Sequence, residues 1–480
     1  MIFRKFVHFA KSNELKLPDT IEACHELIHQ LLATVGLLQN RVADLEQKLN
    51  QNSRNSSRPP SSDGFKKQPA IPKKKKKQGG QQGHKGNTLK MVAHPDELEE
   101  LKPEHCRHCQ QSLQAVTKFT LNSRRQQFDL PEIRLYIKEF RSYACTCPHC
   151  GTQNQGEFPK GVQAPVQYGP GVRSLVTLLH QNGCMSMSKV QQLFDDLFSA
   201  PLNEATIVQC QNDAYDRLQA EEDYIKAQLL NAEVNNADES GIRVEGSGHW
   251  LHTLGNASFT YQFVHKKRGS KAHEPQLSIL PDYRGWLIHD CYAFYFLFEK
   301  AKHGVCGAHL LRELKGLMET GSSWAEKFHR FLLKLYDDTA QGTKKLPPKE
   351  QNKALSTFDS LIWEGYREEP LAQPPPSGRG RYSNTKGRNL LNRLDNYREA
   401  VLAFAWHKCV PFTNNLAERD IRPAKSKLKV AGCFRTMKGA QNYARIHSFI
   451  STVRKQQLNP FKELRNIFEG KIPSYRFATT

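Results

Sequence analysis

A single carboxylate stands at the start of a strongly basic stretch near the C-terminus. Glu418 lies in TNNLAERDIRPAKSKLK (413–429), and the chain from Ile421 to Lys462 contains ten Lys or Arg residues but no Asp or Glu. A carboxylate facing a phosphate backbone would repel it unless a divalent cation lay between them. Taken alone, Glu418 also fits a capping box in which Asn415 is the helix N-cap. A helix cap and a metal ligand beside nucleic acid are both open interpretations here.

Two aspartates occur in segments with the two-residue alternation of β-strands. Asp238 lies within AEVNNADESGIRV (232–244) and Asp290 within GWLIHDCYAFYF (285–296), each on the same side of its strand as apolar residues. An ionised carboxylate buried without a partner is costly, so each should lie at a strand end, pair with a base or bind a metal. A turn or cap is the commoner role for one aspartate, but two on neighbouring strands favour a shared metal site. Carboxylates are typical ligands of Mg²⁺, and a pair of such ions assists phosphodiester displacement.

Four cysteines form two CxxC pairs, CRHC and the end of CTCPHC. They are Cys106, Cys109, Cys147 and Cys150. Each pair can offer two thiolates from one tight turn, and together they would make a tetrahedral Zn²⁺ site. The intervening chain contains two strand-like runs, 117–130 and 132–145, so a hairpin could bring the pairs together. The alternative is that they are unliganded core cysteines. The other cysteines are scattered, which indicates a reducing compartment.

The composition favours a polyanionic partner. The chain has 480 residues, enough for several domains, with a formal net charge of +21 and a pI of about 9.4. It has no run of eighteen apolar residues and no charged-then-apolar signal layout, so no membrane partner is expected.

An N-terminal helix with a heptad seam is predicted. Its seam positions are Ile21, Cys24, Ile28, Leu31, Val35, Leu38, Val42, Leu45 and Leu49. So narrow an apolar stripe favours self-association as a coiled coil, with packing onto its own chain as the alternative. A flexible basic linker is expected next, over residues 51–90, and it is able to neutralise phosphates without reading sequence. Its central lysines are Lys73, Lys74, Lys75, Lys76 and Lys77.

The remaining chain alternates between helical and strand patterns. Residues 170–230 are expected to be helical, either as a helix-turn-helix DNA reader or as ordinary helical hairpins. Strands are predicted over 232–244, 249–257, 259–265 and 285–296, with a helix-like segment before the last, which suggests a mixed α/β sheet. A mainly helical stretch follows from Gly307 to about Val410, and NYARIHSFISTVRKQQ is expected to form the last amphipathic helix.

Several motifs in this order carry a family resemblance. They are GGQQGHKG (79–86), the paired CxxC sequences, ADESG (237–241), HDCYAFY (289–295), CGAHLLREL (306–314) and TNNLAERDIRPAKSKLKVAGCFRT (413–436). The chain resembles the IS66 family of bacterial insertion-sequence transposases over nearly its whole length.

The resemblance implies an RNase H-like catalytic core whose DDE triad falls on Asp238, Asp290 and Glu418. It further implies two Mg²⁺ or Mn²⁺ ions, cleavage at the ends of a mobile element, and attack of the freed 3′-hydroxyl on target DNA. The family's C-x-x-H signature falls on Cys306 and His309, with packing and metal ligation both open. The implied partners are double-stranded DNA carrying the element's terminal inverted repeats, target DNA, and small accessory proteins of the same element.

The expected fold class is multidomain α+β, and the expected location is the bacterial cytoplasm, associated with the nucleoid. The expected domains are a coiled-coil helix (15–50), the basic linker (51–90), a zinc-ribbon-like β domain (91–152), a helical DNA-binding region (153–230), the first part of the RNase H-like core (231–310), a helical insertion (311–410) and the second part of the core (411–470). The residues expected to contact phosphates beside the core are Arg419, Arg422, Lys425, Lys427, Lys429 and Arg435. A non-enzymatic zinc-containing DNA-binding regulator and an RNase H-like nuclease without strand transfer are the alternative functions.

Overall fold

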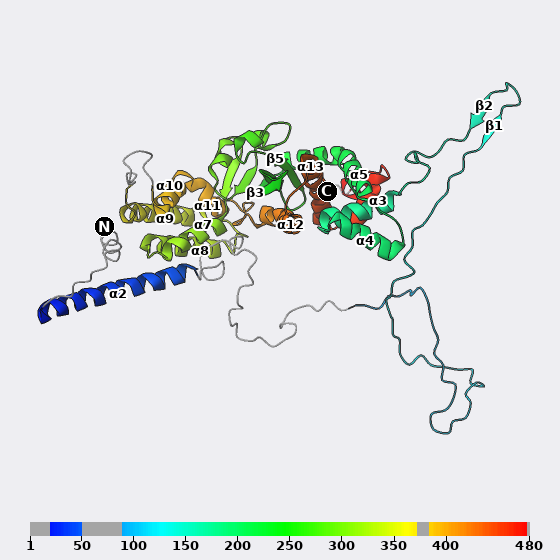
Figure 1. The fold of residues 1–480 in the computed structure, drawn as a ribbon, viewed down its shortest axis with the longest axis horizontal. Helices are drawn as coiled ribbons and strands as arrows, with labels where there is room; N and C mark the ends of the chain where they lie inside the picture. The colour runs from blue at the N-terminus through cyan, green and yellow to red at the C-terminus, as the bar shows by residue number, and fades with distance from the viewer. Residues whose placement is uncertain (1–19, 50–88, 372–383, 478–480) are drawn as a thin grey trace. The chain divides into compact units, whose positions relative to one another are not determined.

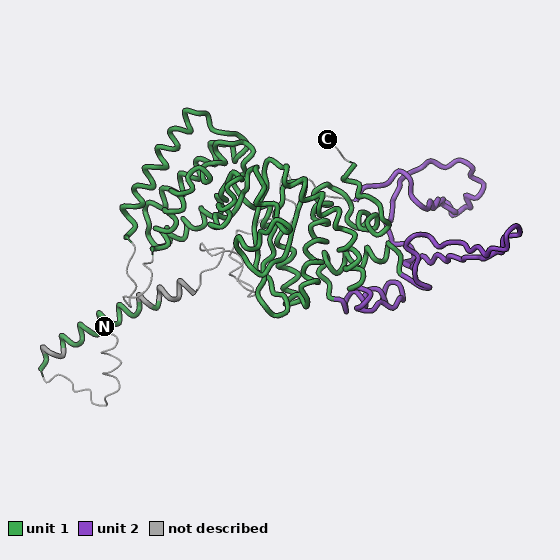
Figure 2. The backbone as a smooth tube through the Cα atoms, turned by 90° about the horizontal axis from the view of Figure 1, so that it is seen from above, with its two compact units in different colours: residues 1–66, 168–186, 208–480 green, residues 67–167, 187–207 purple. Residues whose placement is uncertain are grey.

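The computed structural model describes residues 20–49, 89–371 and 384–477. The basic linker with Lys73 to Lys77 therefore lies outside the described residues, apart from its last two positions. The chain divides into two compact units, of which one comprises residues 1–66, 168–186 and 208–480 and the other 67–167 and 187–207 (Figure 2).

A long N-terminal helix, α2 (Ile21–Leu49), forms where the heptad pattern predicts one. The described seam side chains are exposed, from 43% for Leu38 to 72% for Ile21. The helix thus presents an apolar stripe to solvent in this single chain. Self-association through it stays a prediction.

A five-stranded mixed sheet forms the centre of the larger unit (Figure 1). Its strands are β3 (Val234–Val244), β4 (Ser247–Gly255), β5 (Thr260–His265), β6 (Trp286–His289) and β7 (Lys302–Val305). The spatial order is β5-β4-β3-β6-β7, in which β3, β4 and β5 pair antiparallel while β6 and β7 run parallel to β3. Glu245 and Gly246, both with positive φ, make the tight turn between β3 and β4.

The first three strands were predicted from the alternation, and the rest of the sheet was predicted less well. β6 ends at His289, because the aromatic run after it turns into the 3₁₀ helix η5 (Ala293–Leu297) instead of continuing the strand. The short strand β7 was not predicted. The segment expected to be helix-like before β6 contains only a 3₁₀ turn, η4 (Leu280–Asp282).

Two layers cover the sheet. Helices α12 (Asn415–Ala431) and α13 (Met437–Lys455) contact β3, β4 and β5, and apolar side chains such as Ile242 and Val244 pack against them. The other face carries Ala237 and Leu254, which pack with the short 3₁₀ segments and with Leu229 of α6. Successive residues of β3 therefore point into different layers.

The predicted helical insertion between β7 and α12 is present. It consists of α7 (Gly307–Met318), α8 (Ser323–Asp338), α9 (Pro348–Glu368), α10 (Lys386–Asn396) and α11 (Arg398–Trp406). These helices share a core around Trp324, Phe328, Phe358 and Phe404, and this core reaches Ile288 and Val305 at the edge of the sheet. The insertion is therefore packed against the end of β6, where Asp290 follows.

Residues 168–230 are helical, as predicted. They form α3 (Pro170–Thr177), the π-helical turn η2 (Leu178–Asn182), α4 (Met187–Phe198), α5 (Glu204–Arg217) and α6 (Gln219–Leu230). α5 and α6 are separated at Leu218. In the C-terminal region α14 (Pro460–Phe468) contributes Leu464 and Ile467 to a core shared with α13. A helix-turn-helix role for α4 and α5 stays a prediction.

The smaller unit contains α4 and, among its other described residues, little regular structure. Its strands are β1 (Ala144–Thr146) and β2 (Gln153–Gln155), paired antiparallel. The hairpin predicted over 117–145 is wrong in this structure, since residues 117–143 form no strand. Their apolar side chains stay exposed, and Tyr136 is 89% exposed.

No helix in the described parts of the chain is long and apolar enough to cross a membrane.

Candidate active site

Strand register brings the two aspartates side by side. β3 and β6 run parallel, with Val234 opposite Trp286 and Asn236 opposite Ile288. Asp238 and Asp290 each lie two residues beyond the pair formed by Asn236 and Ile288. Asp290 is the first residue beyond β6, so its side chain is freed from the sheet but held near it. The Asp290 Oδ1 atom accepts a hydrogen bond from the backbone N–H of Tyr292 at 3.0 Å.

The third carboxylate enters from the first turn of α12, and Asn414 fixes where that helix begins. The Asn414 side chain donates to the carbonyl of Ala237 (2.7 Å) and accepts from the amide of Asn236 (2.9 Å). The Asn414 backbone N–H donates to Cys306 Sγ at 3.2 Å. Because Ala237 precedes Asp238, these contacts fasten the start of α12 to β3 next to the first aspartate.

The capping-box interpretation of Glu418 is wrong. The residue before the helix is Asn414, not Asn415, and its side chain makes no cap hydrogen bond within α12. Instead that side chain hydrogen-bonds to β3. Glu418 keeps a backbone N–H bond to the Asn414 carbonyl at 3.3 Å, and its own carboxylate is left available to the site.

The three carboxylates repel one another electrostatically. Burial is the largest cause that raises the pKa of Asp238, followed by the charges of Glu239, Asp290 and Glu418, and together they bring it to about 7. The backbone N–H of Glu239 offsets this in part by donating to Asp238 Oδ1 at 2.8 Å. Negative charge is thus concentrated at a half-buried place, and among the described residues no base pairs directly with Asp238, an arrangement that favours cation binding.

The donor set fits a divalent cation, although the side chains are not yet in ligand positions. Among the described residues, no group of three or more His, Cys, Asp or Glu side chains lies close enough to hold a metal ion. The Glu418 Oε1 atom lies 3.9 Å from His309 Nε2. Oxygen ligands from Asp and Glu suit Mg²⁺ or Mn²⁺, and the charge of Glu418 acts on Asp238.

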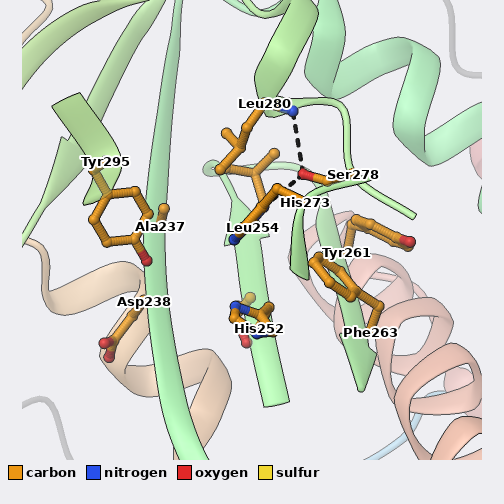
Figure 3. A pocket seen from close by; sticks show the side chains of 11 residues that line it. Ala237, Asp238, His252, Leu254, Tyr261, Phe263, His273, Ser278, Leu280 and Tyr295 are labelled. Carbon is orange, nitrogen blue, oxygen red and sulfur yellow. Dashed lines mark hydrogen bonds between the residues drawn. The ribbon is translucent and has the colours of Figure 1, made fainter. Parts of the chain in front are cut away.

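A small pocket lies on the other side of β3 and has a different character. Ala237, Leu254, Tyr261, His252 and His273 line it. Asp238 also borders the pocket, but in Figure 3 its carboxylate points away from these rings. Burial lowers the pKa of His252 to about 4 and that of His273 to about 3, so both are neutral near pH 7. The pocket therefore offers no cation for a phosphate, and the α12 side of the sheet is the candidate reaction side.

Glu239 and Arg268 support the first aspartate, and the sequence reasoning did not identify them. The Glu239 side chain is 1% exposed, accepts from Tyr295 Oη at 2.6 Å, and pairs with Arg268 at 2.7 Å. The Arg268 guanidinium also lies over the Tyr292 ring, 4.1 Å from its centroid. The alternation in ADESG places Glu239 on the strand face opposite Asp238. This second acidic residue on the other face was the sequence feature that could have pointed to Glu239.

Cys306 has a packing role. Its side chain is fully buried at the N-cap of α7, and its Sγ atom accepts the hydrogen bond from Asn414. Burial raises the pKa of the Cys306 thiol, so the thiol stays protonated. Of the two interpretations left open for the C-x-x-H signature, this geometry favours packing for Cys306, while His309 faces Glu418.

Most of the predicted phosphate-contacting residues on α12 are exposed. Those with exposed side chains are Arg419, Arg422, Lys425, Lys429 and, just after the helix, Arg435. Glu418, Arg422, Lys425 and Lys429 follow spacings of four, three and four, so they share one face of the helix. A stripe of positive charge thus leads away from the carboxylates.

Lys427 does not belong to that stripe. It is 7% exposed, and its Nζ atom donates to the carbonyl of His180 at 2.9 Å and lies over the Tyr443 ring. Burial lowers the pKa of Lys427 to about 8. Since its ammonium group is used inside the fold, Lys427 is not available to a phosphate, and its assignment from the sequence is corrected.

Each predicted zinc knuckle is formed as a turn. Cys106 N–H donates to the Gln111 carbonyl (2.9 Å), and Cys147 N–H donates in the same way to that of Thr152 (2.8 Å). Backbone N–H groups of Cys109 and His108 lower the pKa of the Cys106 thiol. Each turn is suited to present thiolates. The two turns do not come together into a four-sulfur cluster among the described residues.

Comparison with known families gives two matches. The family described as "Transposase IS66 family" matches residues 165–442, which contain all three carboxylates and the insertion. A family of unknown function, DUF6444, matches residues 13–90, which contain α2 and the basic linker. No curated protein matches the chain.

Proposed function

We propose, from the premise that this chain belongs to the IS66 family of transposases, that it is a DDE transposase of a bacterial insertion sequence. It would bind the element's terminal inverted repeats and catalyse metal-dependent DNA strand cleavage and strand transfer. The observation that supports the proposal is that the charges of Asp290 and Glu418 act on Asp238, although the three carboxylates lie far apart in the sequence. The strand order, with three antiparallel strands followed by two parallel ones, supports an RNase H-like core.

Asp238, Asp290 and Glu418 would hold Mg²⁺ or Mn²⁺. Such ions lower the pKa of a bound water and neutralise charge on the attacking and leaving oxygens of a phosphodiester. With a pKa of about 7, Asp238 carries its proton part of the time near neutrality, and that proton must leave before the carboxylate binds a cation. Asn414 keeps Glu418 beside β3, and Glu239 with Arg268 keeps β3 and the segment after β6 in place. These residues set the geometry before DNA arrives.

Exposed cations on α12 would bind the DNA backbone. Arg422, Lys425 and Lys429 lie on the helical face that begins with Glu418, so a strand bound along this face would lead a phosphate to the carboxylates. Such contacts hold register without reading bases. Reading of the terminal repeats would fall to the helical region, the knuckle region or both.

Zinc and oligomerisation are further parts of the proposal. The matching turns at Cys106–Cys109 and Cys147–Cys150 would hold one structural Zn²⁺ if the two turns approach each other. The exposed seam of α2 would pair with a second copy, which supports a synapse of two element ends. Accessory proteins of the same element are additional candidate partners.

The test is a cleavage and joining assay on DNA carrying the element's ends. Wild-type protein should nick and join in Mg²⁺ or Mn²⁺, and Asp238→Asn, Asp290→Asn and Glu418→Gln should each abolish cleavage while gel-shift affinity stays within about twofold. Full activity in any of these variants would remove that residue from the triad. Nicking without joining would indicate a nuclease, and binding without nicking a non-enzymatic regulator.

A further inference from the structure

Two arginines from different parts of the chain lie around Asp290. Arg268 follows β5, whereas Arg393 belongs to α10 of the helical insertion. Burial lowers the pKa of both guanidinium groups, but pairing with Glu239 raises that of Arg268, pairing with Glu313 raises that of Arg393, and the charge of Asp290 adds to both rises. Both side chains are partly open to solvent, Arg268 to 38% and Arg393 to 31%. Two partly exposed cations therefore act on the second aspartate, and Arg268 also lies over the ring of Tyr292, whose backbone N–H donates to Asp290 Oδ1.

Arg393 connects the insertion to the site through α7. Its guanidinium nitrogens pair with the Glu313 carboxylate, with one contact at 3.2 Å. Glu313 lies one helical turn after His309, the residue that faces Glu418. Burial raises the pKa of the thiol of Cys291, the residue after Asp290, and the charge of Arg393 acts against this rise. The insertion thus delivers a positive charge beside the reacting carboxylates.

Arg268 borders the same aspartate from the body of the sheet. It pairs with buried Glu239, next to Asp238 in the chain, and lies between the Trp250 and Tyr292 rings at 4.9 and 4.1 Å from their centroids. These contacts fix the plane of the guanidinium group while about a third of the side chain remains exposed. A guanidinium held in this way is suited to bidentate recognition of phosphate oxygens.

We propose that Arg268 and Arg393 form a phosphate-binding site beside Asp290, through which the helical insertion holds the DNA strand on which the carboxylates act. This inference rests on the proposed function, since the ligand is a DNA phosphodiester. Glu313 is 43% exposed, so it can turn to water when Arg393 takes a phosphate as its partner. A pair so close to solvent contributes little by itself, and exchange of partner costs little.

Arg393 is the residue to test, because removal of Arg268 would leave Glu239 buried without its cation. The assay is fluorescence anisotropy in Ca²⁺ with an oligonucleotide of the element's end, in which each phosphate near the cleavage position is replaced in turn by an uncharged methylphosphonate. Arg393→Ala should weaken binding about tenfold, as expected for a charge-assisted phosphate contact. Replacement of one particular phosphate should weaken binding of the wild type about tenfold and change binding of Arg393→Ala very little. Arg393→Lys should recover part of the loss, because it keeps the charge.

Glu313→Gln separates binding from architecture. It removes the partner of Arg393 but keeps the arginine, so DNA affinity should be retained or increased. A purely structural Arg393 would instead make Glu313→Gln as damaging as Arg393→Ala. The control is Arg330→Ala, which breaks a similar Arg–Glu pair with Glu326 on the exposed side of α8 and should leave binding unchanged.

The inference is overturned if the loss of DNA affinity caused by Arg393→Ala adds to the loss caused by each methylphosphonate in turn. It is also overturned if Glu313→Gln weakens binding as much as Arg393→Ala. If Arg393→Ala does not fold, Arg393→Lys and Glu313→Gln decide by the same comparison. Since Ca²⁺ supports binding without requiring cleavage, failure of the wild type to cut in Mg²⁺ would contradict the proposed function and leave this result standing. A wild type that cuts, with additive effects at Arg393, would contradict this inference alone.

Discussion

Asp238→Asn should stabilise the metal-free protein. Burial and the neighbouring carboxylates move the pKa of Asp238 from 3.8 to about 7, and about 3 units at about 1.4 kcal/mol each correspond to about 4 kcal/mol. Solvent screening of this half-buried group reduces the expected gain to about 1–3 kcal/mol. Asparagine keeps the shape of the side chain and removes the charge.

The size of this gain in stability depends on pH in a way that identifies its cause. Between pH 3.8 and about 7 the folded state binds more protons at Asp238 than the unfolded state, so the stability of the wild type falls as pH rises through this window. At pH 8 the wild type bears the full cost of the ionised carboxylate. At pH 5 the folded wild type is protonated there, so the gain from Asp238→Asn should fall to about a third.

Urea unfolding in EDTA at pH 8 and pH 5 measures this difference. Asp282→Asn is the matched control, since Asp282 is an exposed aspartate paired with Lys300 at 2.7 Å and its loss should bring no gain at either pH. Adding Mn²⁺ at pH 8 should stabilise the wild type and leave Asp238→Asn unchanged. A variant that is less stable than the wild type at pH 8, or equally stabilised at both values, would refute the electrostatic reasoning.

Three further predictions follow from the site and its surroundings. Asn414→Ala should lower the cleavage rate at least tenfold with DNA affinity unchanged, because the start of α12 loses its bonds to β3, and a fall in affinity alone would speak against a positioning role. Lys427→Met should leave DNA affinity intact. It should also remove the rise in stability that the wild type shows from about pH 8 upward, because the lysine loses its proton at a lower pH in the folded state than in the unfolded state. Weaker DNA binding would return Lys427 to the phosphate-contacting residues. Cys147→Ser should reduce bound zinc from one ion per chain to none by elemental analysis, whereas Cys145→Ser should retain it, and equal zinc content in both would exclude the paired knuckles.

The sequence drew attention to the three carboxylates, but their placement relative to one another depends on features that it shows only indirectly. Alternation within 232–244 predicted β3 and the side on which Asp238 lies. The neighbouring position of Asp290 depends on a parallel pairing between segments about fifty residues apart, which a periodicity pattern does not specify. Capping statistics misassigned Asn415, because the tertiary contacts of Asn414 with β3 override the local preference.

Charge and burial were less predictable than strand type. Lys427 lies in the same basic segment as Lys425 and Lys429. Its position on α12 nevertheless directs its side chain inward, where it donates to the carbonyl of His180. Arg393 and Arg268 lie in no recognisable sequence motif, because the phosphate-binding role proposed for them depends on their tertiary placement. The strand-like runs over 117–143 remain without strands, which shows that alternation alone does not create pairing when no partner strand lies alongside.

The most direct measurement is anomalous diffraction from crystals of the protein grown with Mn²⁺. We expect manganese density bounded by Asp238, Asp290 and Glu418, with Glu418 turned away from His309. Manganese bound elsewhere, with the three carboxylates unliganded and Glu418 still facing His309, would contradict this expectation.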